Sequence, residues 1–169
     1  MYLSILTLLF SLHSTQVFSM VVGTIDMQKT LFSTKEGQKI RKKLEASFNK
    51  KKTALKKQEN KLKKAKEGFD KKSRLLSADA RRKEEKKLQK MLLDLEGKRR
   101  QYESEIRKME ADLTGPVVKR IYGVVAEVAK KRKVDVVFEK GSSPVIYAAN
   151  KKDITGDVTK LHNKKYPGK

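Results

Sequence analysis

Cysteine and tryptophan are absent from the 169-residue chain, and phenylalanine and tyrosine together number only 11. Without cysteine there can be no disulfide, no thiolate nucleophile and no thiolate metal ligand. Charged residues make up 37% of the chain, a composition that long exposed helices tolerate better than a compact sphere does, because surface residues dominate them. The absences favour a small core that carries a long extension.

Recognisable catalytic patterns are missing as well. No glycine-rich phosphate loop follows a predicted strand, and the nearest stretch, "EKGSSPV", has the spacing of a hairpin turn. His13 lies in an apolar N-terminal segment and His162 near a polar C-terminus, so neither has other potential metal ligands nearby in the sequence. Carboxylates such as Glu84 and Glu85 lie among lysines on a solvated helical face. We therefore expect no enzyme, no cofactor and no metal.

Residues 1–19 contain no Lys, Arg, Asp or Glu. The apolar run from Leu3 to Leu12 has the length of a signal-peptide core, and Ser19 ends an acceptable cleavage site. This pattern predicts a cleaved export signal and a mature chain that starts at Met20. The usual basic segment before the apolar run is missing. The alternative is that Met20 is the true initiator and the protein is cytoplasmic.

The net charge of +22 is unevenly distributed. Residues 39–74 carry 16 Lys or Arg against 4 Asp or Glu, a net charge of +12 on one predicted helix. Such a field attracts nucleic acid, anionic lipid or acidic polypeptide. The alternative is a solvated helical face with no binding role.

The pattern of elements begins with a strand over residues 21–27. Ser33 and Glu36 have the spacing of a capping box, which starts a helix that runs to about Leu76. At ~1.5 Å per residue this helix is roughly 60 Å long and must project from the core. Ser77 is the expected turn at its far end, since it can cap a second helix.

The two helices are predicted to form an antiparallel hairpin. On the first helix, apolar residues recur every seven positions, whereas the second helix has a nearly continuous heptad stripe from Leu88 to Leu113, interrupted by Arg99. Pairing around Ser77 brings Phe48 near Ile106, which assigns Phe48 to the seam. Leu62 then falls near Leu92, and Leu55 lies opposite Arg99.

The C-terminal part is expected to return to the body. Gly115 and Pro116 are predicted to interrupt the second helix, after which an apolar face follows. Strands are predicted at 134–138 and 144–149, followed by a short helix after Asp153 and a frayed tail at 164–169. The fold class is α+β, with residues 20–36 and 114–163 forming a small β-body and residues 37–113 a protruding helical hairpin.

Some apolar residues cannot face the partner helix: Leu75, Leu76, Met91 and Leu93. Either they pack against one another at the tip, or they are adaptable contacts for a non-native chain.

The order "VGTIDM", a capped helix, a lysine-rich hairpin, "VDVVFEK" and "VIYAANKKDITGDV" resembles the Skp/OmpH family of periplasmic chaperones across the mature chain. The resemblance implies a homotrimer with a β-barrel body and three arms around a cavity. It implies an ATP-independent periplasmic holdase that binds unfolded outer-membrane β-barrel proteins. The implied residues of the body core or trimer contact are Val22, Ile25, Val136, Phe138 and Ile146.

The arm lysines are the candidates for electrostatic capture of a client: Lys50, Lys51, Lys52, Lys56, Lys57, Lys63 and Lys64. Their number exceeds what the solubility of a helix requires, which also raises contact with lipopolysaccharide or anionic lipid. Two alternatives remain: a basic coiled coil that binds nucleic acid through phosphates, which we consider the weaker reading, and a structural spacer of the cell envelope.

Overall fold

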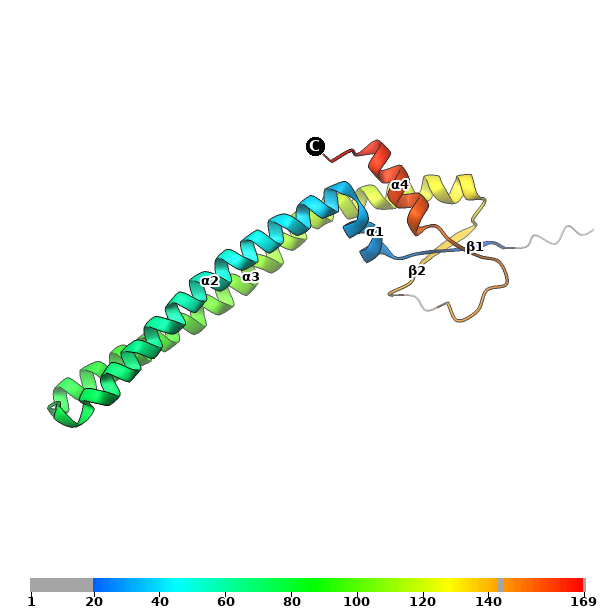
Figure 1. The fold of residues 1–169 in the computed structure, drawn as a ribbon. Helices are drawn as coiled ribbons and strands as arrows, with labels where there is room; N and C mark the ends of the chain where they lie inside the picture. Colours follow the sequence, from blue (N-terminus) through cyan, green and yellow to red (C-terminus); the bar gives the residue numbers. More distant parts are fainter. Residues whose placement is uncertain (1–19, 143–144, 169) are drawn as a thin grey trace, which may run out of the picture.

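A computed structural model describes residues 20–142 and 145–168. The predicted signal at residues 1–19 lies outside the described residues. The chain forms a small body from which a long helical hairpin, here called the arm, projects to one side (Figure 1). Within the described residues, no helix is both long enough and apolar enough to span a bilayer.

The body contains a three-stranded parallel sheet built from both ends of the chain. The strands are β1 (Val22–Ile25), β2 (Val136–Glu139) and β3 (Lys151–Asp153), in the order β2-β1-β3. Thr24 of β1 lies opposite Phe138 on one side and Asp153 on the other. The N-terminal strand is therefore the centre of the sheet, and its partners come from the last third of the chain.

The predicted strand at 144–149 is wrong for the part that is described. Residues 145–148 carry no regular secondary structure, and the third strand is instead the polar segment Lys151–Asp153. Backbone pairing to β1 does not require apolar side chains at a sheet edge, where lysines are common.

Asp153 fixes the end of β3. Although burial alone would raise its pKa, hydrogen bonds from Lys140 Nζ and from the hydroxyl and N–H of Thr155 lower the pKa of Asp153 to about 2. The carboxylate thus joins the end of β2, the end of β3 and the start of the last helix.

A short helix that the sequence did not predict lies between β1 and the arm. Helix α1 (Met27–Ser33) begins where the side chain of Asp26 accepts a hydrogen bond from the N–H of Lys29, 2.7 Å away. The N-cap of the next helix is Thr34, whose Oγ1 accepts from the N–H of Gly37 at 3.0 Å. The prediction of Ser33 as the cap is wrong by one residue.

Gly37 permits the tight corner between α1 and α2. A Cβ atom on Gly37 would lie 1.8 Å from the carbonyl oxygen of Leu31. No rotation of a side chain can relieve such a clash, because the obstructing atom belongs to the backbone. Glycine at this position therefore sets the direction in which the arm leaves the body.

The arm consists of α2 (Lys35–Lys72), the 3-10 turn η1 (Ser73–Leu75) and the first part of α3 (Ala78–Arg132). Ser77 caps α3, and its side chain accepts from the N–H of Ala80. The turn therefore lies where the capping residue predicted it. At ~1.5 Å per residue, α2 is about 57 Å long.

The predicted interruption at Gly115 and Pro116 is wrong, because α3 continues through Pro116 to Arg132. A proline inside a helix removes one hydrogen bond and costs about 3 kcal/mol. The turns on its C-terminal side are anchored in the body, where Val117, Ile121 and Val124 are buried. Burial of this face offsets the local cost, since each such side chain contributes about 1.5–3 kcal/mol.

The core lies where α1, α3 and helix α4 (Thr155–Lys165) pack together beside the sheet. It consists of aliphatic side chains from every part of the body: Ile25, Leu31, Ile40, Val117, Ile121, Val124, Val128, Val134, Ile154 and Val158. Because Ile40 belongs to α2, the root of the arm is part of this core.

A buried polar cluster joins α4 to the root of the arm. His162 is fully buried, with its Nε2 atom 3.6 Å from Glu36 Oε2 and its ring 4.9 Å from that of Tyr166. Arg120 of α3 pairs with Glu36 at 3.0 Å. Residues 164–168, expected to fray, continue toward α2, where Lys39 Nζ donates to the Gly168 carbonyl at 2.6 Å.

Candidate binding surface on the helical arm

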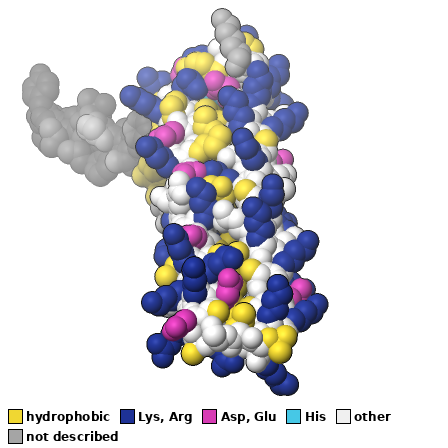
Figure 2. Space-filling view, turned by 90° about the vertical axis from the view of Figure 1, so that its left-hand side faces the viewer, with side chains coloured by type: hydrophobic (Ala, Val, Ile, Leu, Met, Phe, Trp, Pro, Cys, Tyr) yellow, Lys and Arg dark blue, Asp and Glu magenta, His cyan; other side chains and the backbone are white. Residues whose placement is uncertain are grey.

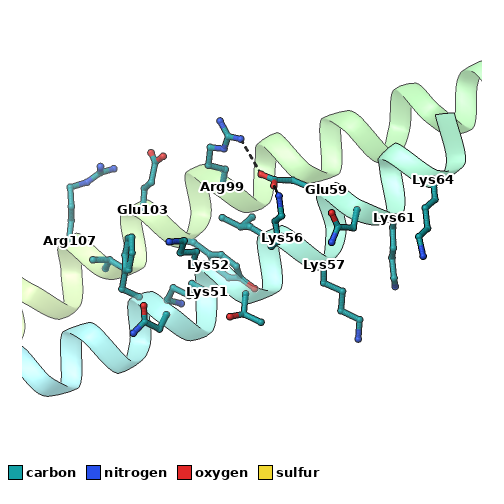
Figure 3. Close-up of a pocket in the computed structure, with 17 residues that line it drawn as sticks. Lys51, Lys52, Lys56, Lys57, Glu59, Lys61, Lys64, Arg99, Glu103 and Arg107 are labelled. Carbon is teal, nitrogen blue, oxygen red and sulfur yellow. Dashed lines mark ion pairs between the residues drawn. The ribbon is translucent and has the colours of Figure 1, made fainter. Parts of the chain in front are cut away.

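A large groove runs along the middle of the arm between α2 and α3. Its volume is about 1370 Å³. Its walls carry eight basic and two acidic residues together with four large apolar ones. Figure 3 shows Arg99, Glu103 and Arg107 pointing away from α3, and Lys57, Lys61 and Lys64 pointing away from α2. The basic residues are Lys51, Lys52, Lys56, Lys57, Lys61, Lys64, Arg99 and Arg107; the apolar ones are Phe48, Leu55, Tyr102 and Ile106.

Arg99 explains why the groove exists at this place. It occupies a heptad position that apolar residues fill elsewhere on α3, but its own side chain is 58% exposed and pairs with Glu59 at 3.7 Å. Leu55, one turn before Glu59 on α2, lines the groove beside this charged position. By contrast, Leu95, one turn earlier on α3, is buried. The single charged position thus leaves the seam open on one side.

The wall of the groove near Tyr102 is ordered by several polar contacts. Lys51 pairs with Glu105 and lies 4.5 Å from the centre of the Tyr102 ring, and Lys98 lies 5.1 Å from the same centre. Hydrogen bonds from Lys51 and Gln101 to Glu105 lower the pKa of that carboxyl. These contacts hold the phenol ring in place beneath two cations.

Most of the rim lysines have no carboxylate partner. Among the described residues, no carboxylate oxygen lies within 4.0 Å of Lys52, Lys57, Lys61 or Lys64. Glu59 is shared between Arg99 and Lys56, the latter at 4.0 Å. The rim therefore has a large excess of positive charge. Figure 2 shows the same imbalance over the arm, with apolar patches surrounded by lysine and arginine and few acidic side chains between them.

Five of the seven lysines proposed from the sequence lie in this groove: Lys51, Lys52, Lys56, Lys57 and Lys64. The other two do not line it. Lys63 pairs with Glu67 at 3.9 Å, and Lys50 is exposed outside the groove.

The four apolar candidates are not in the groove. Leu75 is 88% exposed in the turn at the tip, and Leu93 is 58% exposed on α3. Leu76 and Met91 are half-buried. The structure thus separates a mid-arm groove from a single very exposed leucine at the tip.

Phe48 does not pack in the seam as its heptad spacing predicts. It was expected to pack in the seam opposite Ile106, yet it is 56% exposed and lines the groove with Ile106. Tyr102 and Arg107 were also not proposed as binding residues. Arg99 is the sequence signal that could have indicated the opening near Tyr102, because a charged residue in a heptad stripe opens the seam around it. Nothing in the spacing singles out Phe48 or Arg107.

The five residues proposed for the body differ in their environments. Ile25 is buried in the core, and Val22 is half-buried. Val136 and Phe138 are each 36% exposed on β2, and Ile146 is 98% exposed, next to Tyr147 at 84%. The body of one chain therefore leaves four large apolar side chains exposed, which we call the body patch (Val136, Phe138, Ile146 and Tyr147).

Within residues 20–142 and 145–168, no cluster of three or more His, Asp or Glu side chains could hold a metal ion. His162, to which the sequence assigned no role, belongs to the polar cluster at the arm root described above.

A family model and a solved structure resemble this chain. The family model "Outer membrane protein (OmpH-like)" matches residues 21–161. The crystal structure of a putative OmpH-like outer membrane chaperone from Caulobacter crescentus CB15 superposes with a TM-score of 0.68 over 93% of this chain and 90% of that one, at 15% identity. No curated protein matches the sequence. With this fold and a family match over nearly the whole described chain, the protein belongs to the OmpH-like family.

Proposed function

We propose that this protein is an ATP-independent holdase chaperone of the periplasm, which binds unfolded outer-membrane β-barrel proteins between its arms and prevents their aggregation. The observation that carries the proposal is the arm itself: a rod that projects from the body, with an apolar-floored groove under unpaired lysines. Membership of the OmpH-like family supports the same conclusion. This function requires that a client be bound and released, and it requires no covalent bond to be made or broken.

The mechanism has an electrostatic and an apolar part. Positive arms attract and confine segments of opposite charge, and at physiological salt this acts over a Debye length of ~8 Å. Weak contacts to Phe48, Leu55 and Tyr102 then cover exposed apolar side chains, which would otherwise associate with one another. Because each contact is weak, the client can leave when a membrane offers it a better environment.

The proposed assembly is a homotrimer in which the bodies associate and the arms surround a cavity. Two observations support association. The body patch is apolar and exposed, and β2 and β3 are both edges of the sheet within one chain. An exposed sheet edge beside an apolar surface favours pairing with another chain.

Export is the second component of the proposal. We infer that residues 1–19 are removed and that the mature chain starts at Met20. N-terminal sequencing of the protein from fractionated cells tests this. A start at Met20 in the exported fraction supports the periplasmic role, whereas an intact or cytoplasmic chain contradicts it.

Dilution of a urea-unfolded outer-membrane β-barrel protein into buffer, with and without this protein, tests the holdase activity. We expect light scattering to be suppressed at one trimer per client, without nucleotide. No suppression would leave the structural-spacer reading. Tight and steeply salt-dependent binding of nucleic acid, together with retention in the cytoplasm, would favour the nucleic-acid reading instead.

Contact with lipopolysaccharide or anionic lipid is a further candidate, favoured by one observation at the tip. Leu75 is 88% exposed, and basic residues flank it in the sequence at positions 71, 72, 74, 81, 82 and 83. An apolar side chain inside a basic collar suits an anionic lipid surface. Flotation with anionic and with neutral vesicles tests this contact, and equal binding to both would exclude it.

A further inference from the structure

The groove on the arm has the length of a short extended peptide. Its lining residues on α2 run from Phe48 to Lys64. At ~1.5 Å per residue this stretch measures about 24 Å. An extended chain rises ~3.3 Å per residue, so about seven residues of a client would fill it.

The floor of the groove is apolar and partly open. Phe48 is 56% exposed even though it faces the partner helix, and Leu55, Tyr102 and Ile106 continue the same floor. An extended peptide points alternate side chains to opposite sides. Apolar side chains at every second position would therefore face this floor together.

The lysines at the rim of the groove determine which client residues can lie between the apolar ones. Lys52, Lys61 and Lys64 lie at the rim without a carboxylate partner among the described residues. Long lysine side chains can rest along apolar surface and bring their charge to a partner above it. Acidic side chains on the upper side of the peptide would meet these cations, whereas basic ones would be repelled.

We propose that the groove between α2 and α3 binds an extended client segment of about seven residues in which apolar side chains alternate with acidic ones. This inference rests on the proposed holdase function and specifies which part of a client the arm selects. Strands of a membrane β-barrel alternate apolar and polar residues with the same period of two. The arm therefore recognises a pattern rather than a sequence.

Three fluorescein-labelled eight-residue peptides test the preference: valine alternating with glutamate, the same composition arranged in two blocks, and valine alternating with lysine. Fluorescence anisotropy on the full-length mature protein gives the dissociation constants. We expect the alternating acidic peptide to bind at least about tenfold more tightly than the other two. Equal binding of the block or the lysine peptide would overturn the inference.

Variants locate the site. The triple variant Lys52→Gln, Lys61→Gln and Lys64→Gln should weaken binding about tenfold at low salt, if each exposed pair contributes about 0.5 kcal/mol. Its matched control changes Lys42, Lys43 and Lys66 to Gln, which removes the same charge outside the groove. Phe48→Ser should also weaken binding about tenfold, whereas Leu93→Ser, a change at a similarly exposed apolar residue, should not. Equal effects of the groove and control variants would overturn the groove assignment.

Two further readouts separate this inference from the proposed function. If wild-type protein suppresses client aggregation but the groove variants bind the acidic peptide normally, the inference fails and the holdase stands. If the peptide binds in the groove but no client is protected, the holdase proposal fails instead. Displacement of the peptide by a single-stranded oligonucleotide at lower concentration than by unlabelled peptide would assign the groove to nucleic acid and overturn the inference.

Discussion

The Nε2 atom of His162 lies 3.6 Å from Glu36 Oε2, across the junction between the C-terminal helix and the root of the arm. Burial of the imidazole lowers its pKa, while Glu36 raises it and Arg120 lowers it. Both ring nitrogens lack a hydrogen-bond partner among the described residues, as does Glu36 Oε2. Protonation of His162 at this junction is therefore unfavourable, although the Glu36 carboxylate lies near as an acceptor.

The first prediction concerns pH. Because the folded-state pKa of His162 is lowered, the unfolded chain binds more protons once the pH falls below about 6.5. The contribution of neutral His162 to the free energy of unfolding should be fully present above that pH. It should decrease as the pH falls toward the folded-state pKa of His162. His162→Phe keeps an aromatic ring beside Tyr166 and removes the titration. Urea unfolding at pH 7.5 and 5.5 should show a smaller difference for the variant, and an unchanged difference would contradict this assignment.

The second prediction concerns the corner at Gly37. Gly37→Ala should destabilise the protein by more than 2 kcal/mol or shift the arm root, because its Cβ would meet the carbonyl oxygen of Leu31. Gly68→Ala is the matched control, since nothing lies within 4 Å of that Cβ inside α2. The control should gain up to about 1 kcal/mol of helix propensity. Thermal unfolding followed by circular dichroism measures both variants, and similar shifts would refute the corner argument.

The third prediction separates arm from body. Leu95 is the buried apolar residue of the arm seam, so Leu95→Ala should cost about 2–3 kcal/mol. The loss should be local: amide exchange should accelerate in residues near 55–62 and 92–99 but not around Ile121. Leu92→Ala, at a residue 45% exposed, should cost less. Faster exchange throughout the body would show that arm and body unfold together.

The fourth prediction addresses assembly. Phe138→Ser and Ile146→Ser change two residues of the body patch that are 36% and 98% exposed in one chain. The double variant should retain its helix content but lose the trimer mass measured by light scattering. Leu93→Ser, at an exposed residue of the arm, should leave the mass unchanged. A wild-type protein with the mass of a single chain would contradict the proposed assembly itself.

The overall layout of arm and body followed from the sequence because local signals specified it. Ser77 caps α3 as predicted, and the heptad stripe with the sparse leucines of α2 indicated the hairpin. The pairing was also close: Lys51 contacts Glu105 and Glu59 contacts Arg99, within one helical turn of the expected register.

The errors arose where packing overrides local preference. Pro116 predicts a helix end, but the buried face that follows it holds the helix in one piece. The apolar segment 144–149 predicts a strand, yet within one chain the backbone of Lys151–Asp153 pairs with β1 instead. The exposure of Phe48 could not be predicted from its heptad spacing, which assigns it to the seam, yet it is 56% exposed.

The central position of β1 has a consequence for how the chain must fold. Its neighbours are distant in sequence, as the contacts of Val21 with Asp135 over 114 residues and of Asp26 with Thr155 over 129 residues show. Such long-range pairing is slow, because loop closure must occur before the contacts form. The hairpin closes locally, and its closure brings Glu36 and Arg120 together at the root of the arm. A nascent chain can thus complete its arm early, whereas its first strand stays unpaired until the segment from Val136 to Asp153 has been made.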